Sequence, residues 1–253
     1  MENIIIADNT VVKIFKNSSE LHINAAGYIC ASIRHSINRR KRCTMVLSGG
    51  TTPKMLYDEI ANNYKDSVEW DKVYFFWGDE RCVPPSSKDS NYKMAYEHLL
   101  SKLPVLKENI FRIQAERHPE EAVSLYEEAI KIFFDNNPLP SFDIILLGIG
   151  TDGHTASLFP GSKALETKDM LAVPVFAEKM QSWRVTMTFP AINHSKNILI
   201  IAEGKEKSAI INKVFNDAKA ALPVQEIKAL NGQLTWFIDK EAAGIAFPGS
   251  GNK

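Results

Sequence analysis

Four short apolar runs constrain how this chain can fold more than any other feature. Each run is apolar at consecutive positions, which is typical of strands that helices cover on both faces of a parallel sheet. The runs span residues 45–47, 73–77, 144–147 and 198–201, and shorter candidates span residues 171–176 and 234–238. Because helix-like segments separate these runs, the sequence predicts a doubly wound, mostly parallel, Rossmann-like α/β sheet with helices on both faces.

The helix-like segments carry apolar repeats and terminal residues that helices favour. A four-residue apolar repeat predicts a long first helix, and its members are Leu21, Ala25, Ile29, Ile33 and Ile37. A second helix is expected to begin at Pro53 with Thr52 as its N-cap, since both residues are favoured there. Two more helices are expected at residues 119–134 and 205–214. Ligands of such sheets bind at the carboxyl ends of the strands, so each segment that follows a strand is a candidate site.

The length and charge of the chain narrow the partners that it can have. Its 253 residues suit a single α/β domain covering residues 1–253. Lys plus Arg and Asp plus Glu each number 30, so the formal net charge is zero and no general attraction to nucleic acid or an anionic membrane is expected. The basic run at residues 39–42 is interpreted as solvated surface at a helix end, with a nucleic-acid role as a minor alternative. No obligate protein partner is implied.

The cysteines and the amino terminus indicate the cellular compartment in which the protein is expected. Cys30, Cys43 and Cys82 form no C-x-x-C pair and leave an odd count, which argues against a disulfide framework or a zinc site. The amino terminus lacks the charged and apolar regions of a signal peptide, and no stretch approaches the roughly 20 apolar residues that span a bilayer. The expected location is therefore the cytoplasm.

The segment after the first apolar run has the features of a phosphate-binding loop. It contains Gly49, Gly50, Thr51 and Thr52 between a strand and a helix. Glycines let the backbone approach an anion, and the free amides of a helix start supply donors and positive potential. No G-K-[ST] follows, so the segment is not a Walker loop and ATP hydrolysis is not expected. The alternative is an ordinary strand-to-helix turn.

Three charged residues follow the second apolar run. Arg81 could hold a phosphate or a carboxylate in a bidentate fork. Asp79 or Glu80 could accept hydrogen bonds from sugar hydroxyls or fix Arg81 in place. The alternative is a solvated loop with a local ion pair.

The segment after the third run contains a G-x-G-x-x-G pattern with a histidine. A dinucleotide site is rejected, because Pro160 and Gly161 cut the following helix to under two turns and no acidic residue lies at the expected distance of about 20. Asp152 and His154 flank a glycine at this strand end. An imidazole titrates near neutral pH, so His154 is a candidate general base, with Asp152 holding its tautomer or binding a sugar hydroxyl.

Two segments with cationic residues complete the candidate site. Arg184 lies before Pro190, and Lys205 and Lys207 follow the fourth apolar run. Lys207 is expected in the first turn of a helix, at the same sheet edge as the loops described above. The alternative for either lysine is an ordinary surface position.

Together these segments resemble the 6-phosphogluconolactonase family. The matching stretches are residues 47–53, 78–83 with Asn91 downstream, 148–162, 184–193 and 204–207, and the sequence of residues 150–161 is the most specific. The related glucosamine-6-phosphate deaminases follow Gly-His with Ile-Ala-Phe-Asn-Glu-Pro, where this chain has Thr-Ala-Ser-Leu-Phe-Pro at residues 155–160. They also carry Asp-Glu-Tyr where this chain has Asp-Glu-Arg at residues 79–81. The resemblance implies a NagB/RpiA-like fold.

The resemblance also implies a reaction, which is the hydrolysis of 6-phospho-D-glucono-1,5-lactone to 6-phospho-D-gluconate in the pentose phosphate pathway. The expected catalytic residues are His154, Asp152 and Arg81, and the expected substrate-binding residues are Gly49, Gly50, Thr51, Thr52, Asp79, Arg184 and Lys207. Arg81 either binds the phosphate or faces the lactone carbonyl. No cofactor, metal or covalent intermediate is expected, because a δ-lactone is already activated. A deaminase or isomerase of phosphorylated amino sugars and a non-catalytic sugar-phosphate sensor remain as alternatives.

Overall fold

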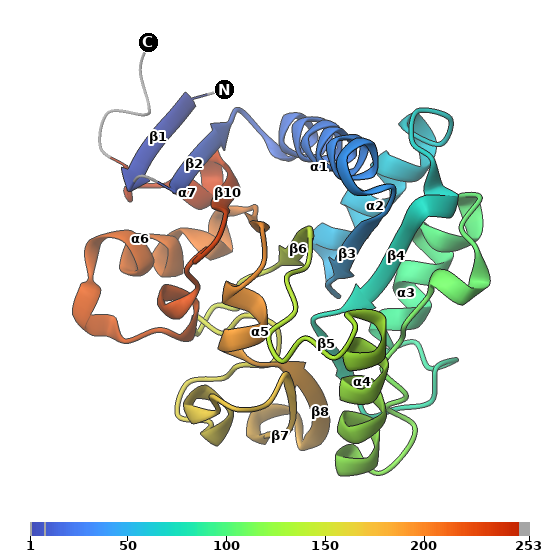
Figure 1. Ribbon diagram of the computed structural model, residues 1–253. Coiled ribbons are helices and arrows are strands. Elements are labelled where there is room, and N and C mark those ends of the chain that lie inside the picture. The colour runs from blue at the N-terminus through green and yellow to red at the C-terminus, as the bar shows by residue number, and fades with distance from the viewer. Residues whose placement is uncertain (1, 8, 248–253) are drawn as a thin grey trace.

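A seven-stranded sheet forms the centre of the molecule (Figure 1). The structure, a computed structural model, describes residues 2–7 and 9–247. In spatial order the strands are β1 (Glu2–Ala7), β2 (Thr10–Phe15), β10 (Gln233–Asp239), β9 (Asn197–Ala202), β6 (Ile144–Leu147), β3 (Cys43–Leu47) and β4 (Val73–Trp77). All neighbours pair in parallel except β1, which is antiparallel to β2. The prediction of a mostly parallel sheet is confirmed.

Helices cover both faces of this sheet. They are α1 (Ser18–Arg40), α2 (Thr51–Asn63), α3 (Asn91–His98), α4 (Pro119–Phe133), α5 (Phe189–Asn193), α6 (Ser208–Asn216) and α7 (Lys240–Ala243). On β10 the ring of Phe237 packs against Tyr28 of α1, and the next ring along the strand, Trp236, packs against Phe215 of α6. Successive residues of a strand point to opposite faces, so α1 and α6 lie on opposite sides of the sheet.

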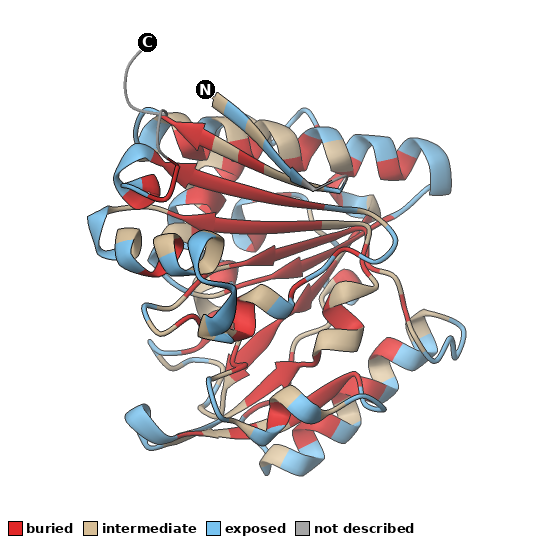
Figure 2. Cartoon of the chain, turned by 90° about the vertical axis from the view of Figure 1, so that its left-hand side faces the viewer, coloured by how far each residue is buried: buried red, intermediate tan, exposed pale blue. Residues whose placement is uncertain are grey.

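The apolar patterns of the sequence account for this packing. All five residues of the predicted repeat in the first helix are buried, and Figure 2 shows the strands of the large sheet as an almost continuous buried layer, except at β1. None of the helices within the described ranges is long and apolar enough to cross a membrane.

A second, three-stranded antiparallel sheet lies beside the large one, and the sequence did not predict it. Its order is β5 (Asp79–Arg81), β8 (Ser182–Met187) and β7 (Ala172–Ala177). The charged residues after β4 therefore form a strand rather than a loop, and the predicted strand at residues 171–176 belongs to this sheet. The cause is long-range pairing. Gly78, which directly follows β4, donates to the carbonyl of Leu47 at the end of β3 at 2.9 Å and accepts from the amide of Met187 of β8 at 2.8 Å.

The start of α2 differs from the prediction. The helix begins at Thr51, its N-cap is Gly50, and no side chain caps it. Gly50 has a φ of 109°, a backbone conformation that glycine adopts most readily. This lets the chain turn into the helix before Thr52, so Thr52 lies inside the first turn and is not the N-cap.

Two further segments differ in detail from the helices expected there. No α-helix directly follows His154. Residues 148–162 form turns, and the only helical element between His154 and β7 is a 3-10 helix, Lys163–Glu166. Ala156 has a φ of 48°, a left-handed conformation that a right-handed helix does not tolerate. The predicted helix at residues 205–214 begins as a 3-10 turn, Lys205–Lys207, and continues as α6.

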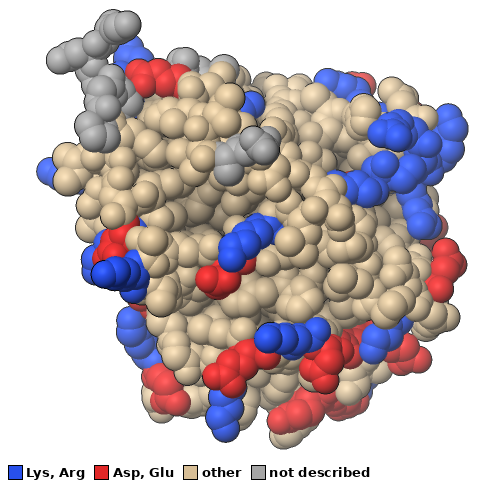
Figure 3. Space-filling model, turned by 60° about the vertical axis from the view of Figure 1, so that its left-hand side comes forward, with Lys and Arg blue, Asp and Glu red and all other residues tan. Residues whose placement is uncertain are grey.

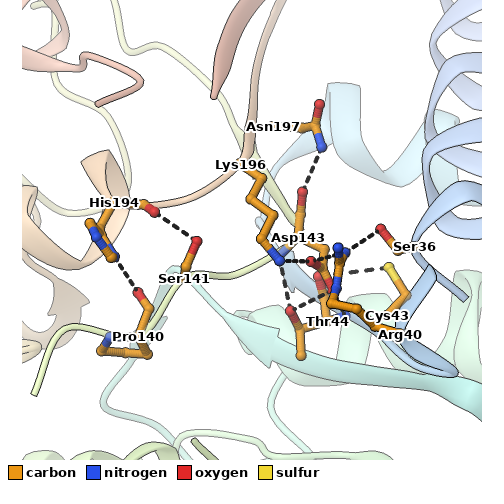
Figure 4. A network of polar contacts seen from close by, with 10 residues as sticks. All are labelled: Ser36, Arg40, Cys43, Thr44, Pro140, Ser141, Asp143, His194, Lys196 and Asn197. Carbon is orange, nitrogen blue, oxygen red and sulfur yellow. Dashed lines mark hydrogen bonds and ion pairs between the residues drawn. The ribbon is translucent and has the colours of Figure 1, made fainter. Parts of the chain in front are cut away.

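A buried carboxylate ties the amino ends of three strands to α1 (Figure 4). Asp143, which directly precedes β6, accepts hydrogen bonds from Arg40 at 2.5 Å, from Lys196 at 2.7 Å and from the backbone amide of Thr44 at 2.9 Å. Its side chain is only 4% exposed. The cluster lies at the sheet edge opposite to the candidate functional loops, so its role is structural.

Basic side chains gather at one corner of the surface, whereas acidic and basic side chains are interspersed along the lower edge of the same view (Figure 3). Residues 39–42 are exposed, as expected for solvated surface. Two of these cations have partners within the chain, since Arg40 pairs with Asp143 and Arg42 stacks on Phe133.

Candidate active site

The candidate residues meet at the carboxyl edge of the large sheet because four neighbouring parallel strands end there. β6 lies between β3 and β9, and β3 also pairs with β4. The loops that follow these strands therefore leave the same edge. They carry the residues predicted from the sequence: residues 49–52, 79–81, 152–154 and Lys207. Arg184 joins them from β8, directly opposite Arg81 of β5.

The first loop is anchored by a buried tyrosine. The Tyr57 hydroxyl accepts from the backbone amide of Ser48 at 2.9 Å and donates to its carbonyl at 2.8 Å. Thr51 and Gly50, which follow, are exposed at the start of the 13-residue α2. The amides of a first helical turn have no partner within the helix, so this loop has the geometry of an anion-binding helix start.

Asp79 connects three of the loops and is itself only 5% exposed. Its Oδ1 accepts from Asn91 at 3.2 Å, and the Asn91 side chain lies directly against Gly49 of the first loop. Its Oδ2 accepts from the Ser157 hydroxyl at 2.6 Å and lies 3.9 Å from Nη1 of Arg184. The cation that Asp79 contacts is therefore Arg184, whereas the sequence pointed to Arg81.

Glu80 is buried and holds the local backbone. Its carboxylate accepts from the backbone amides of Arg81, Asn91 and Tyr92 at 2.7–2.8 Å and from the Ser90 hydroxyl at 3.0 Å. Burial raises the pKa of Glu80, and these amide donors partly oppose the effect. With its oxygens committed to these donors, Glu80 fixes the start of α3.

Two arginines present unpaired donors at the site. Arg81 donates from Nη1 to the carbonyl of Asp89 at 2.6 Å, and the guanidinium of Arg184 lies 5.8 Å from the ring centre of Phe159. The Nε atoms of both arginines are buried and have no partner among the described residues. Burial lowers the pKa of Arg184, an effect that Asp79 partly offsets, and a guanidinium remains charged at neutral pH. Buried donors of this kind normally have a partner, so the pair is a candidate anion site.

His154 and Asp152 form a close hydrogen-bonded pair. Nδ1 of His154 lies 2.5 Å from Oδ1 of Asp152, and the other carboxylate oxygen lies 3.3 Å from Nζ of Lys179. Partial burial would raise the pKa of Asp152, but the hydrogen bonds and charge of His154, together with Lys179, lower it to about 2. The imidazole is 28% exposed, so it does not point into the protein interior.

The hydrogen bond between Nδ1 of His154 and Asp152 leaves the second ring nitrogen, Nε2, available. A carboxylate only accepts, so Nδ1 carries the hydrogen and Nε2 has a free lone pair. Gly150 makes room for this arrangement, because a Cβ there would lie 2.1 Å from the imidazole ring. An aspartate-oriented imidazole with a free Nε2 can act as a general base.

A cavity of about 750 Å³ lies beside His154. Besides Thr151, Asp152 and His154, its walls come from residues 159–164, 174–180 and Trp183. Residues 49–52 and the two arginines do not line this cavity. Gly49 and Arg184 connect to the His154 loop through Asn91, Asp79 and Ser157.

The sequence reasoning missed Phe159, Lys179 and Trp183 as wall residues. Phe159 packs on the imidazole, with ring centres 4.8 Å apart, and lay within the motif at residues 150–161. Lys179 and Trp183 belong to a segment that carries no motif.

Of the two lysines, the structure brings Lys207 to the site. Its Nζ donates to the carbonyl of Ile149 at 2.9 Å, in the loop that leads to His154. Lys205 is exposed.

Comparison with known proteins identifies the family of the chain. The family model described as glucosamine-6-phosphate isomerases/6-phosphogluconolactonase matches residues 16–236. Probable 6-phosphogluconolactonase 1 of Arabidopsis thaliana is 37% identical to this chain over 249 residues, and the match covers 93% of each chain. Probable 6-phosphogluconolactonase 2 of Oryza sativa subsp. japonica is 34% identical over 250 residues, and the match covers 93% of this chain and 89% of the relative.

Solved structures show the same similarity. The 6-phosphogluconolactonase of Trypanosoma brucei superposes with a TM-score of 0.81 at 30% identity, covering 92% of this chain and 97% of that one. That of Thermotoga maritima gives 0.80 at 29% identity, covering 91% and 100%. The chain therefore belongs to the glucosamine-6-phosphate isomerase/6-phosphogluconolactonase family.

Proposed function

We propose that this chain hydrolyses 6-phospho-D-glucono-1,5-lactone to 6-phospho-D-gluconate, the second step of the oxidative pentose phosphate pathway. The observation that carries the proposal is the His154–Asp152 pair, 2.5 Å apart at the wall of a cavity. Relatives named 6-phosphogluconolactonase, which match nearly the whole chain, support the choice of substrate.

In the proposed mechanism His154 acts as the general base. Nε2 takes a proton from water as the water oxygen attacks the lactone carbonyl, and the resulting imidazolium is stabilised by Asp152. The proton then passes to the ring oxygen as the C1–O bond of the lactone breaks, which balances the reaction. General-base catalysis of this kind contributes about 10²–10⁴-fold, and positioning of the substrate adds to it.

The phosphate has two sets of donors available in this proposal. One set is the loop of residues 49–52 at the start of α2, and the other is the cation group of Arg184 and Lys207. Arg81 either joins the phosphate site or faces the lactone carbonyl and stabilises the developing oxyanion. Asp79 is buried, so in this proposal it acts by holding Arg184 and Ser157 rather than by direct contact with the sugar.

The proposal is tested with fresh 6-phosphogluconolactone. We expect acid release well above the spontaneous rate from the wild-type chain. The His154→Ala variant should lose about 10²–10⁴-fold in kcat while it still binds 6-phosphogluconate. His118→Ala is a matched control, because His118 is an exposed histidine with a side chain 76% accessible. We also expect kcat/KM to fall on the acid side with one histidine-like ionisation.

Three results would contradict the proposal. Ammonia release from glucosamine 6-phosphate without lactone hydrolysis would indicate the deaminase activity. Binding of 6-phosphogluconate without any turnover would indicate a sensor. A kcat/KM that is flat from pH 5 to 8 would exclude His154 as the base.

The domain organisation, location and partners of the chain remain predictions. We propose a single catalytic domain over residues 1–253 that works in the cytoplasm on a small sugar phosphate, with no cofactor and no obligate protein partner. Relatives include a probable chloroplastic 6-phosphogluconolactonase of Oryza sativa subsp. indica, 34% identical to this chain, so fractionation of the source cells is the measurement that tests the location.

A further inference from the structure

One aromatic ring contacts both the proposed base and the neighbouring cation. The ring of Phe159 lies 4.8 Å from the imidazole of His154, centre to centre, with the two planes tilted by 50°. The guanidinium carbon of Arg184 lies over the same ring, 5.8 Å from its centre. Phe159 also lines the cavity of about 750 Å³, yet the mechanism described above gives it no part.

Hydrogen bonds hold the turn that carries Phe159. The amide of Leu158 donates to the carbonyl of Thr155 at 2.9 Å, and the amide of Ser162 donates to the carbonyl of Phe159 at 3.1 Å. The hydroxyl of Thr155 donates to the carbonyl of Gly148 at 2.8 Å. Leu158 is fully buried. The backbone that presents the ring is therefore fixed against the loop that carries His154.

The same turn also fixes a second neighbour of the arginine. Ser157, two residues before Phe159, donates to Asp79 at 2.6 Å, and Asp79 lies 3.9 Å from Nη1 of Arg184. The side chain of Arg184 is 12% exposed. One short segment of chain therefore sets both the carboxylate and the aromatic ring that the guanidinium contacts.

His154 and Arg184 carry a free acceptor and a free donor that are not paired with each other. Nε2 of His154 keeps its lone pair, because Nδ1 carries the hydrogen toward Asp152. Nε of Arg184 is buried and has no partner among the described residues. Buried polar atoms normally pair when a partner is within reach. A hydrogen bond from Arg184 would occupy the lone pair that takes the proton from water, and the ring that contacts both groups is that of Phe159.

We propose that Phe159 is a positioning residue whose ring holds the imidazole of His154 and keeps Arg184 away from it, so that Nε2 stays available to water. This inference rests on the proposed function, because it assigns a role in the same reaction. The face of an aromatic ring also attracts cations, so the ring stabilises the imidazolium that forms during the reaction. The alternative is that the ring only fills the cavity wall, in which case another apolar side chain would serve equally well.

The kinetic experiment replaces Phe159 with leucine, which removes the ring and keeps an apolar side chain. We expect kcat at the plateau of the pH profile to fall roughly tenfold, with KM for 6-phosphogluconolactone within about threefold of wild type. Phe159→Tyr keeps the ring and should retain kcat within about threefold of wild type. Phe134→Leu is the matched control, because Phe134 is also half-buried and packs on Phe142, just before β6 at the opposite edge of the sheet.

An NMR titration of the imidazole nitrogens tests the same inference without turnover, with His154→Asn to assign the signal. The charged groups around the imidazole all remain in Phe159→Leu, and they are Asp152, Arg184, Lys163, Glu178 and Lys179. Loss of the ring face and approach of the guanidinium both disfavour the imidazolium. The titration midpoint of His154 should therefore fall by roughly half a pH unit to one unit. In an Arg184→Leu background the fall should be less than half as large, because no guanidinium is left to approach.

Three outcomes would overturn the inference: a wild-type kcat and midpoint in Phe159→Leu, a rise in KM alone in that variant, or an equal shift of the midpoint with and without Arg184. Should Phe159→Leu fail to fold, Phe159→Met takes its place with the same expectations. If the wild-type chain fails to hydrolyse the lactone, the proposed function is wrong, but the NMR titration still decides whether Phe159 keeps Arg184 away from His154.

Discussion

Replacement of Asp152 by asparagine removes the negative charge beside His154 and leaves the shape of the side chain unchanged. The pKa of Asp152 is lowered from 3.8 to about 2, and 1.36 kcal/mol per pKa unit makes this about 2.5 kcal/mol. The carboxylate is a quarter exposed, and solvent screening reduces the interaction to roughly 1–2 kcal/mol. Since the imidazole becomes positively charged in the transition state, kcat should fall roughly five- to thirtyfold.

The assay is acid release from saturating 6-phosphogluconolactone, with the spontaneous rate subtracted. Asp66→Asn is the control, because Asp66 is an exposed turn residue. An unchanged kcat in a folded Asp152→Asn variant would refute the argument that this charge assists the base. A rise in KM alone would show that Asp152 binds a sugar hydroxyl instead.

Three further predictions concern Gly150, the buried Asp143 cluster and the stability of the chain at low pH. Gly150→Ala should lower kcat/KM by about tenfold or more, because its Cβ would meet the His154 ring at 2.1 Å; wild-type activity would contradict this. Asp143→Asn should lower the free energy of unfolding in urea by about 3–5 kcal/mol, because two cations lose their buried partner; a change below about 1 kcal/mol would refute that role. The pKa values of Asp152 and of Glu203, which pairs with His22, are both lowered to about 2, so their contributions to stability are present above about pH 4 and are lost as the pH falls toward 2. Urea midpoints measured from pH 6 to pH 2 should therefore decrease, and a flat or rising series would contradict the two pairings.

The sequence alone could reveal those parts of the site whose residues lie close together along the chain. His154 and Asp152 are two residues apart, so one turn brings them together and the motif alone identified the pair. The helix start at residues 49–52 was likewise visible as glycines and hydroxyls after a buried strand, although the positive φ of Gly50 moved the helix start and removed Thr52 as its cap.

The sequence by itself also determined the central strands and the long first helix, because an apolar period requires no knowledge of the partner that buries it. Only the tertiary structure decided the second sheet, the pairing of Asp79 with Ser157 across 78 residues and the contact of Glu203 with His22 across 181. These contacts depend on which strands become neighbours and on the direction in which each loop leaves its strand. The spatial order of the sheet therefore selects the partners of each charged side chain, and no local pattern in the chain encodes that order.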